Sequence, residues 1–318
     1  MTVMVRRSRR VALAALVAAM VAGCSDGTAI DPAASPEPIP LVGAKGDFAI
    51  DTSNPAAAWV GRNQGSPLAA TVRDRVVGRP NAHLVKATES GVAADVAPYL
   101  DAARDTGKQA ILLADADAGA ACGTISPVAY SSWGSALGAA VGGRDVIIVL
   151  RLGGAACKTA RPAGERQRLT DEVVSNLRAT AGKVRIILDV SDLAAQEPAM
   201  VTRFLETVAV GKLTGIAVNV GLNAGDAEVA AMVSKIQLGH LVALQDSSRS
   251  GAGGENSCNR PEARVGPWLT LNPDPGAVQR MWLTTPGVSD GPCGAAPNST
   301  AGEFVPELAT LLLDKQRR

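Results

Sequence analysis

Short apolar segments rich in β-branched residues recur along the chain, and most of them are followed by a stretch with helical periodicity. Segments 146–150 and 184–188 are almost continuously apolar, which is typical of strands buried on both faces of a sheet. We predict strands at residues 48–50, 83–86, 109–113, 145–150, 183–189, 215–220, 240–244 and 280–283, and helices at residues 96–106, 130–141, 169–179, 197–208 and 227–236.

The alternation of these strands and helices predicts βα units and a parallel sheet. No glycine-rich phosphate loop opens the first helix, which disfavours a nucleotide-binding doubly wound sheet. We therefore predict a closed or nearly closed β/α barrel, α/β in class. Its functional site should lie where the strands end, at residues 114–122, 151–157, 189–192, 219–223, 245–251 and 284–290.

The first 23 residues have the pattern of an export signal. Four arginines at positions 6, 7, 9 and 10 precede an apolar run at residues 11–22, which is shorter than the about 20 residues that a membrane span needs. The sequence Val21–Ala22–Gly23–Cys24 resembles a lipobox, so we expect Cys24 to be lipidated and to anchor the protein to a membrane. The expected location is the outer face of the cytoplasmic membrane or the cell envelope, by the general or the twin-arginine route.

Residues 24–45 are rich in alanine and proline, with prolines at positions 32, 36, 38 and 40. Prolines at alternate positions block a helix and favour an extended tether. Residues 46–318 are long enough for one large domain with a full core. Without the signal the chain has 27 basic and 30 acidic residues, a net charge of −3, which gives no electrostatic footprint for nucleic acid.

Four cysteines follow Cys24, and an even number in an exported chain argues for two disulfides. They are Cys122, Cys157, Cys258 and Cys293. Metal ligation is disfavoured because no Cys-x-x-Cys pair is present and the chain has two histidines, both in apolar strand contexts. We expect neither a metal nor another cofactor.

Several segments, taken in order, resemble glycoside hydrolase family 6, the cellobiohydrolases and endoglucanases that act on β-1,4-glucans. The similarity starts at residues 51–59 and continues through Tyr130-x-x-Trp133, the strand ends at 188–189, 215–220 and 246–251, and residues 302–306. The most specific match is Trp282–Leu–Thr–Thr–Pro–Gly–Val–Ser–Asp–Gly291 with Cys293. The resemblance implies a distorted barrel of about seven parallel strands and the disulfides Cys122–Cys157 and Cys258–Cys293.

The family inverts the anomeric centre with a protonated carboxyl group on one side of the bond and a carboxylate that assists water on the other. Asp290 matches the residue proposed as the family's base. The two positions that hold the acid and its supporting aspartate in the family are Gly153 and Ala121 here, and neither side chain can transfer a proton. The remaining family-like positions suggest substrate-binding residues, namely Asp189, Asn219, Asp246, Arg249 and Trp282, with Trp268 as a stacking surface.

Three functions are consistent with these residues. The preferred hypothesis is an exported lipoprotein whose family 6 barrel is impaired in hydrolysis or has lost it, and is kept for glycan binding or an envelope role. A second is a divergent inverting glycosidase that uses Asp290 as base and Asp115 or Asp117 as a displaced acid. A third is an envelope scaffold that binds a protein. A β-glucan-like carbohydrate is the expected partner under the first two.

Overall fold

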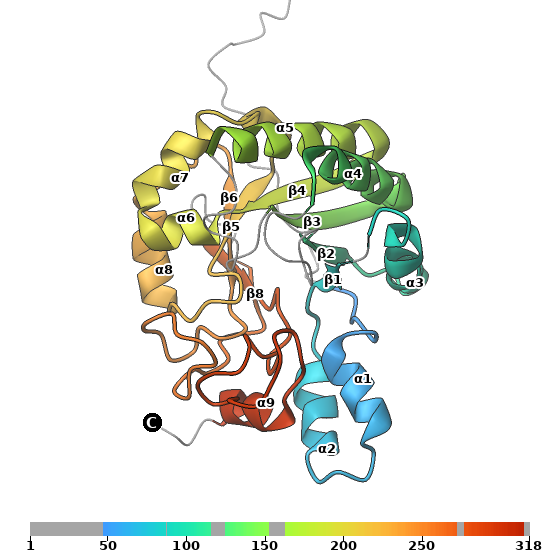
Figure 1. The fold of residues 1–318 in the computed structure, drawn as a ribbon, viewed down its shortest axis with the longest axis vertical. Helices are drawn as coiled ribbons and strands as arrows, with labels where there is room; N and C mark the ends of the chain where they lie inside the picture. Colours follow the sequence, from blue (N-terminus) through green and yellow to red (C-terminus); the bar gives the residue numbers. More distant parts are fainter. Residues whose placement is uncertain (1–46, 87, 116–124, 153–162, 272–276, 315–318) are drawn as a thin grey trace, which may run out of the picture. The chain divides into compact units, whose positions relative to one another are not determined.

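The structure is a computed structural model that describes residues 47–86, 88–115, 125–152, 163–271 and 277–314. Its strands form a single curled sheet surrounded by helices (Figure 1). The strands are β1 (His83–Val85), β2 (Ala110–Asp115), β3 (Asp145–Arg151), β4 (Lys183–Asp189), β5 (Gly215–Val218), β6 (Val242–Asp246), β7 (Leu269–Thr270) and β8 (Val278–Met281).

The helices differ in length from four to 18 residues. They are α1 (Pro55–Arg62), α2 (Ala69–Val72), α3 (Val92–Asp105), α4 (Pro127–Val141), α5 (Ala163–Thr180), α6 (Ser191–Gln196), α7 (Pro198–Leu205), α8 (Asp226–Val233) and α9 (Pro306–Leu313), with a π-helical turn η1 (Arg73–Val77) and a 3₁₀ turn η3 (Val210–Lys212). None of the helices in the described ranges is long and apolar enough to cross a bilayer.

The sheet has the order β1-β2-β3-β4-β5-β6-β8-β7. Seven strands run parallel, and the two-residue β7 pairs antiparallel with β8. The prediction of an α/β distorted barrel is therefore confirmed, with a mixed sheet in place of an all-parallel one. Within the described residues β1 and β7 are the two ends of the sheet, and the predicted strand at 48–50 is reduced to a single bridge between Phe48 and Gln109.

Two layers of side chains follow from the alternation along each strand. Ile111, Ile147, Ile187, Leu244 and Met281 point to one side and form the barrel interior. Their neighbours in the sequence point to the other side and pack against α3, α4, α5, α7 and α8 in the larger core. Both faces of the central strands are thus buried, which explains why their sequences are apolar at nearly every position.

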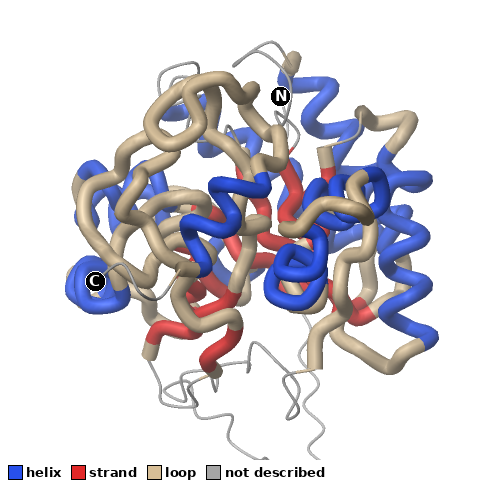
Figure 2. Tube along the Cα trace, turned by 90° about the horizontal axis from the view of Figure 1, so that it is seen from below, coloured by secondary structure: helices blue, strands red, loops and turns tan. Residues whose placement is uncertain are grey.

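The covering of the sheet changes at β6. Helices lie outside the strands up to that point, whereas the connection from β6 to β8 contains β7 and irregular loop in its described part (Figure 2). The outer face of β8 is covered by a different set of elements, because buried Trp282 packs with residues of α1, α2, η1 and α9. The molecule therefore has a helical wall on one side and a loop-rich wall on the other.

Candidate functional site

Polar side chains form the top layer of the barrel interior. On each of four strands, the inward position that follows the apolar interior residues is Asp115 on β2, Arg151 on β3, Asp189 on β4 and Asp246 on β6. Asn219 directly follows β5. We call this layer, together with Arg249 and Asp290 from the loops above it, the mouth of the barrel. The sequence predicted that these strand ends meet, and they do.

Arg151 links three neighbouring strands of the mouth. Its Nε donates to Asp189 Oδ2 at 2.7 Å, and its Nη1 lies 3.7 Å from Asp115 Oδ2. A further N–H donates to the carbonyl of Val220 at 3.2 Å. All three ion-pair side chains are at most 16% exposed, so they interact largely out of water.

The charges in this layer keep Arg151 protonated. Burial alone would lower the pKa of its guanidinium, but the carboxylates of Asp189, Asp115 and Asp246 together raise the pKa above its ordinary value. Arg151 lies within the strand end predicted at residues 151–157, but no sequence pattern singles it out as a site residue. Its partners are far apart in the chain, so the network becomes evident only once the strands are paired.

Asp246 is completely buried and accepts four hydrogen bonds. Its Oδ1 accepts from the amides of Ser248 and Leu283, and its Oδ2 from the amide of Gly221 and the hydroxyl of Thr284, at 2.9 to 3.0 Å. This carboxylate joins the loops after β5, β6 and β8. Its contacts in the structure are those of a residue that shapes the mouth from within.

Asn219 has the same kind of role. It adopts a left-handed conformation with a φ of 62°, which asparagine tolerates better than most residues. Its side-chain amide donates to the carbonyls of Ala224 and Asp246, and its Oδ1 accepts from the amide of Ala224. Asn219 thus fixes the turn that leads from β5 to α8.

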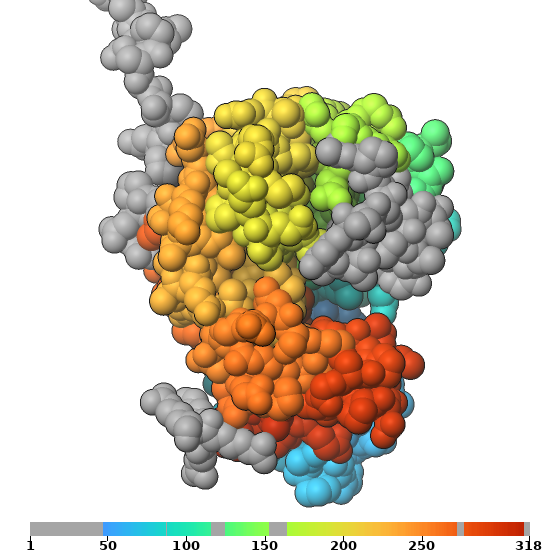
Figure 3. Space-filling model, turned by 60° about the vertical axis from the view of Figure 1, so that its left-hand side comes forward, coloured from blue at the N-terminus to red at the C-terminus, as the bar shows by residue number. Residues whose placement is uncertain are grey.

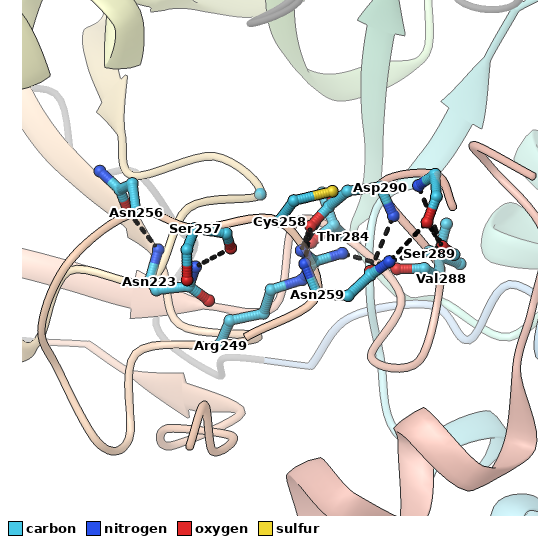
Figure 4. A network of polar contacts seen from close by, with 12 residues as sticks. Asn223, Arg249, Asn256, Ser257, Cys258, Asn259, Thr284, Val288, Ser289 and Asp290 are labelled. Carbon is cyan, nitrogen blue, oxygen red and sulfur yellow. Dashed lines mark hydrogen bonds and ion pairs between the residues drawn. The ribbon is translucent and has the colours of Figure 1, made fainter. Parts of the chain in front are cut away.

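Asp290 lies on the opposite side of the mouth and is held by Arg249 (Figure 4). One guanidinium nitrogen of Arg249 donates to both carboxylate oxygens, at 2.8 and 2.7 Å, and another donates to the carbonyl of Val288 at 2.6 Å. The Asp290 side chain is 33% exposed, whereas that of Arg249 is 6% exposed. The carboxylate that matches the family's base is therefore accessible to solvent and fixed in position.

Asn259 completes this arrangement, although no sequence pattern marks it as a site residue. Its amide donates to Asp290 Oδ2 at 3.0 Å, and its Oδ1 accepts from the amide of Asp290 at 2.9 Å. Its side-chain amide reaches Ser289 Oγ and the carbonyl of Gly291, at 2.9 and 2.7 Å. Asn259 is buried and has a φ of 42°, so backbone and side chain together bind the Ser289–Asp290–Gly291 turn.

A disulfide between Cys258 and Cys293 ties the same two loops together, with 5.9 Å between the Cα atoms. This is one of the two pairings that the family resemblance implied. The loop after β6 and the segment after β8 lie side by side at the surface, in orange and red (Figure 3). The other predicted pair, Cys122–Cys157, lies outside the described residues, as do Cys24, Asp117, Ala121 and Gly153.

The two tryptophans predicted to bind substrate, Trp268 and Trp282, lie away from the polar layer. Trp282 points to the outer side of β8, is 4% exposed and donates its indole N–H to the carbonyl of Gly266. Trp268 is half-buried beside it, with the guanidinium carbon of Arg79 6.0 Å from its ring centroid. Among the described residues no three histidine, cysteine or acidic side chains form a group that could hold a metal ion.

Comparison with known proteins gives distant relatives, although no protein-family model matches the chain. Endoglucanase 1 of Streptomyces halstedii is 26% identical over 281 residues, covering 82% of this chain and 87% of that protein. The structure of endoglucanase Cel6 from Mycobacterium tuberculosis, in complex with methyl-cellobiosyl-4-deoxy-4-thio-β-D-cellobioside, superposes with a TM-score of 0.72 at 22% identity, covering 85% of this chain and 97% of that one.

Endoglucanase CEL6B from Humicola insolens gives a TM-score of 0.61 at 19% identity, covering 84% of this chain and 96% of that one. The sequence match and the two structural matches cover nearly the whole of each relative, so the similarity concerns the complete barrel and not a shared motif. The chain is thus distantly similar in sequence to an endoglucanase and shares the fold of the Cel6 endoglucanases.

Proposed function

We propose that the protein is an exported lipoprotein whose barrel binds β-1,4-glucan-type chains at its mouth, with hydrolysis impaired or lost. The observation that supports impaired or lost hydrolysis is the position of Arg151 in the barrel. It places a cation at the end of β3, the strand that carries the catalytic acid in the resemblance, and it pairs with Asp189 and Asp115. A positive charge there opposes the chemistry of an acid catalyst, which must approach the glycosidic oxygen with a proton to give.

Asp115, one of the two candidates for a displaced acid, is already engaged within the protein. It lies at the mouth, as the sequence predicted, and its carboxylate is paired with the guanidinium of Arg151 at 3.7 Å. At the two positions where the family has carboxylates, this chain has Ala121 and Gly153. Without an acid the leaving oxygen departs unprotonated, and general acid–base catalysis typically contributes about 10²- to 10⁴-fold.

Glucan binding is supported by the polar residues that are present at the mouth. Asp290 is still partly exposed on a rigid turn, and the buried carboxylate of Asp246 and the amide of Asn219 still shape the loops around it. The Cel6 structure that shares this fold holds a cellobiose-derived oligosaccharide. The export signal, the tether at residues 24–45 and lipidation of Cys24 complete the proposal, and would present the barrel at the outer face of a membrane.

The decisive experiment measures binding and turnover on the same preparation. Calorimetric titration with cellotetraose should give saturable heat, and incubation with a soluble β-1,4-glucan should release no reducing ends above a protein-free blank. A matched variant, Ala121→Asp with Gly153→Asp, restores carboxylates to the two positions and keeps Arg151 as the counter-ion of Asp189 and Asp115. It should bind at least as well and gain measurable turnover if the rest of the mouth is intact.

Two results would contradict the proposal. Turnover by the natural protein that disappears in Asp290→Asn and in Asp115→Asn would establish the active-glycosidase alternative. Absence of heat with every neutral oligosaccharide, together with no protection against unfolding, would favour the protein-binding scaffold.

A further inference from the structure

A cleft of about 940 Å³ lies on the outer side of the barrel, away from the mouth. It is lined by the first turn of α8, the loop after β6 at residues 250–254 and 265–268, and residues of η1 and α9. None of Asp115, Arg151, Asp189, Asp246 or Asp290 lines it. It occupies the region beside β6 and β8 where the connection between the two strands is loop.

The two acidic side chains that line the cleft, Asp226 and Glu228, form hydrogen bonds and ion pairs within the protein. Asp226 Oδ1 accepts from the side chains of Gln245 and Ser250, both at 3.1 Å, and its Oδ2 pairs with Arg280 at 3.1 Å. Gln245 and Arg280 are neighbours on the outer face of β6 and β8. The charge of Asp226 is thus matched by an arginine that does not itself line the cleft.

Glu228 is matched in a similar way. Its Oε2 accepts from the amides of Gly225 and Gly254, at 2.6 and 3.1 Å. These two hydrogen bonds hold the pKa of Glu228 below its ordinary value, and the nearby guanidinium of Arg260 lowers it further. Both acids of the cleft are therefore hydrogen-bonded within the protein and lie near an arginine.

Two further arginines line the cleft, Arg75 and Arg79. Arg75 donates to the carbonyl of Leu313 at 3.0 Å, and Arg79 lies over the Trp268 ring. Neither arginine has a carboxylate partner among the described residues. An arginine stacked on an aromatic ring keeps the edge of its guanidinium free for a bidentate contact to a carboxylate or phosphate.

We propose that this cleft binds an acidic saccharide, with its carboxylate or phosphate group at Arg75 and Arg79 and a sugar ring beside Trp268. The two unmatched arginines specify the negative charge. The size of the cleft indicates a ligand larger than an inorganic anion, because about 940 Å³ is in the range of pockets that hold small organic molecules. An indole next to hydroxyl and amide groups suits a ligand that is part apolar and part polar, as a sugar ring is.

The test is a calorimetric titration of the full chain with trigalacturonate, with cellotriose as the neutral counterpart and inorganic phosphate as the bare anion. Arg79→Gln should weaken trigalacturonate binding by about tenfold or more, because a charge-assisted bidentate contact is lost. The matched control is Arg73→Gln, at an exposed arginine of η1 that does not line the cleft. It removes the same net charge and should leave the affinity unchanged.

Four results would overturn the proposal: no heat with trigalacturonate, equal affinity for phosphate, equal weakening by Arg73→Gln, or displacement of trigalacturonate by cellotriose. The last would assign the acidic sugar to the mouth. The inference does not rest on glucan binding, since trigalacturonate can bind whether or not cellotriose does. Arg79→Gln should also leave any cellotriose binding at the mouth unchanged, so the two proposals fail separately.

Discussion

On one side of the mouth, a single cation from β3 lies between carboxylates from β2 and β4. On the other side, Asp290 is held by a guanidinium, by the backbone and side chain of Asn259, and by a disulfide between the two loops that carry them. By the sequence resemblance, the first side lacks the carboxylates expected at positions 121 and 153, whereas the second side has the expected Arg249, Asp290 and Cys258–Cys293 disulfide.

The two sides differ in what a substitution would change. The side of β2 to β4 consists of inward side chains on a paired sheet, so a substitution there changes the charge of the mouth and leaves the backbone in place. The side after β6 and β8 is built from loops whose path depends on the same contacts that position Asp290. A substitution there alters both shape and chemistry, which favours retention.

The largest effect expected is loss of the covalent link on the loop side. Cys258→Ala with Cys293→Ala should lower the free energy of unfolding by about 4 kcal/mol, because the bond closes a loop with a sequence separation of 35. Urea denaturation measures this loss. Ser257→Ala in the same loop is the control, expected to change stability by less than about 0.5 kcal/mol. A loss below about 1 kcal/mol would show that hydrogen bonds alone hold these loops.

Removing the cation from the sheet side should be nearly as costly. Arg151→Leu leaves the side chains of Asp189 and Asp115, 5% and 8% exposed, without their counter-ion, and breaking a buried pair costs about 3 kcal/mol or more. The same denaturation assay tests it. In the control, Arg203→Leu, an exposed pair with Glu197 is lost, which should cost less than about 1 kcal/mol. Equal effects of the two variants would contradict the view of Arg151 as the centre of the network.

A smaller loss is expected from Asn259→Ala. The variant leaves the amide of Asp290 without its side-chain acceptor and removes one donor to the carbonyl of Gly291, and it places alanine at a φ of 42°. Together these effects should destabilise the protein by about 2 kcal/mol. If Asn259 positions Asp290, Asn259→Ala should also weaken cellotetraose binding, whereas Asn63→Ala at the end of α1 should not.

The smallest effect concerns neither side of the mouth but the start of β1. Burial raises the pKa of Asp51, but hydrogen bonds and charge attraction from His83, with hydrogen bonds from Ser53, outweigh it and bring the pKa below 3.8. Asp51 therefore stabilises the fold above pH 3.8, and this contribution is lost as the pH falls through the lower folded value.

Unfolding free energies measured between about pH 2.5 and 6 test this point. Asp51→Asn should flatten the acid limb of the profile, and Asp47→Asn, at a 67% exposed side chain, should leave it unchanged. An unaltered slope in Asp51→Asn would assign the acid sensitivity to other carboxylates, those of the mouth included.

Sequence reasoning placed the elements well where burial on both faces makes a strand apolar. The predicted β4 agrees with the structure at both ends, and the ends of β2, β3, β4 and β6 brought Asp115, Asp189 and Asp246 to the mouth as expected. The short helices α1, α2 and α6 were missed. These helices have too few turns for a hydrophobic periodicity to be recognised. The sequence signal of α1 is instead its start, an N-cap at Asn54 followed by a proline.

The partners of the polar residues could not be derived in the same way. Arg151 acquires its role from Asp189, which is 38 positions away, and Asn259 acquires its role from a turn that the disulfide brings close. Both are long-range contacts without a local pattern. The family resemblance supplied the Cys258–Cys293 pairing, which the spacing of cysteines alone left open.

The incomplete closure of the sheet has a mechanical consequence. Because the sheet runs from β1 to β7 without closing in the described residues, β1 and β8 are not paired, and the gap between them is bridged by side chains such as Asn81, whose amide donates to Thr285 Oγ1 at 2.6 Å. A barrel whose strands are all joined by backbone hydrogen bonds resists widening, whereas a barrel with one unpaired gap can widen at that gap. The compliance of the barrel is thus concentrated along one line, beside the turn that carries Asp290.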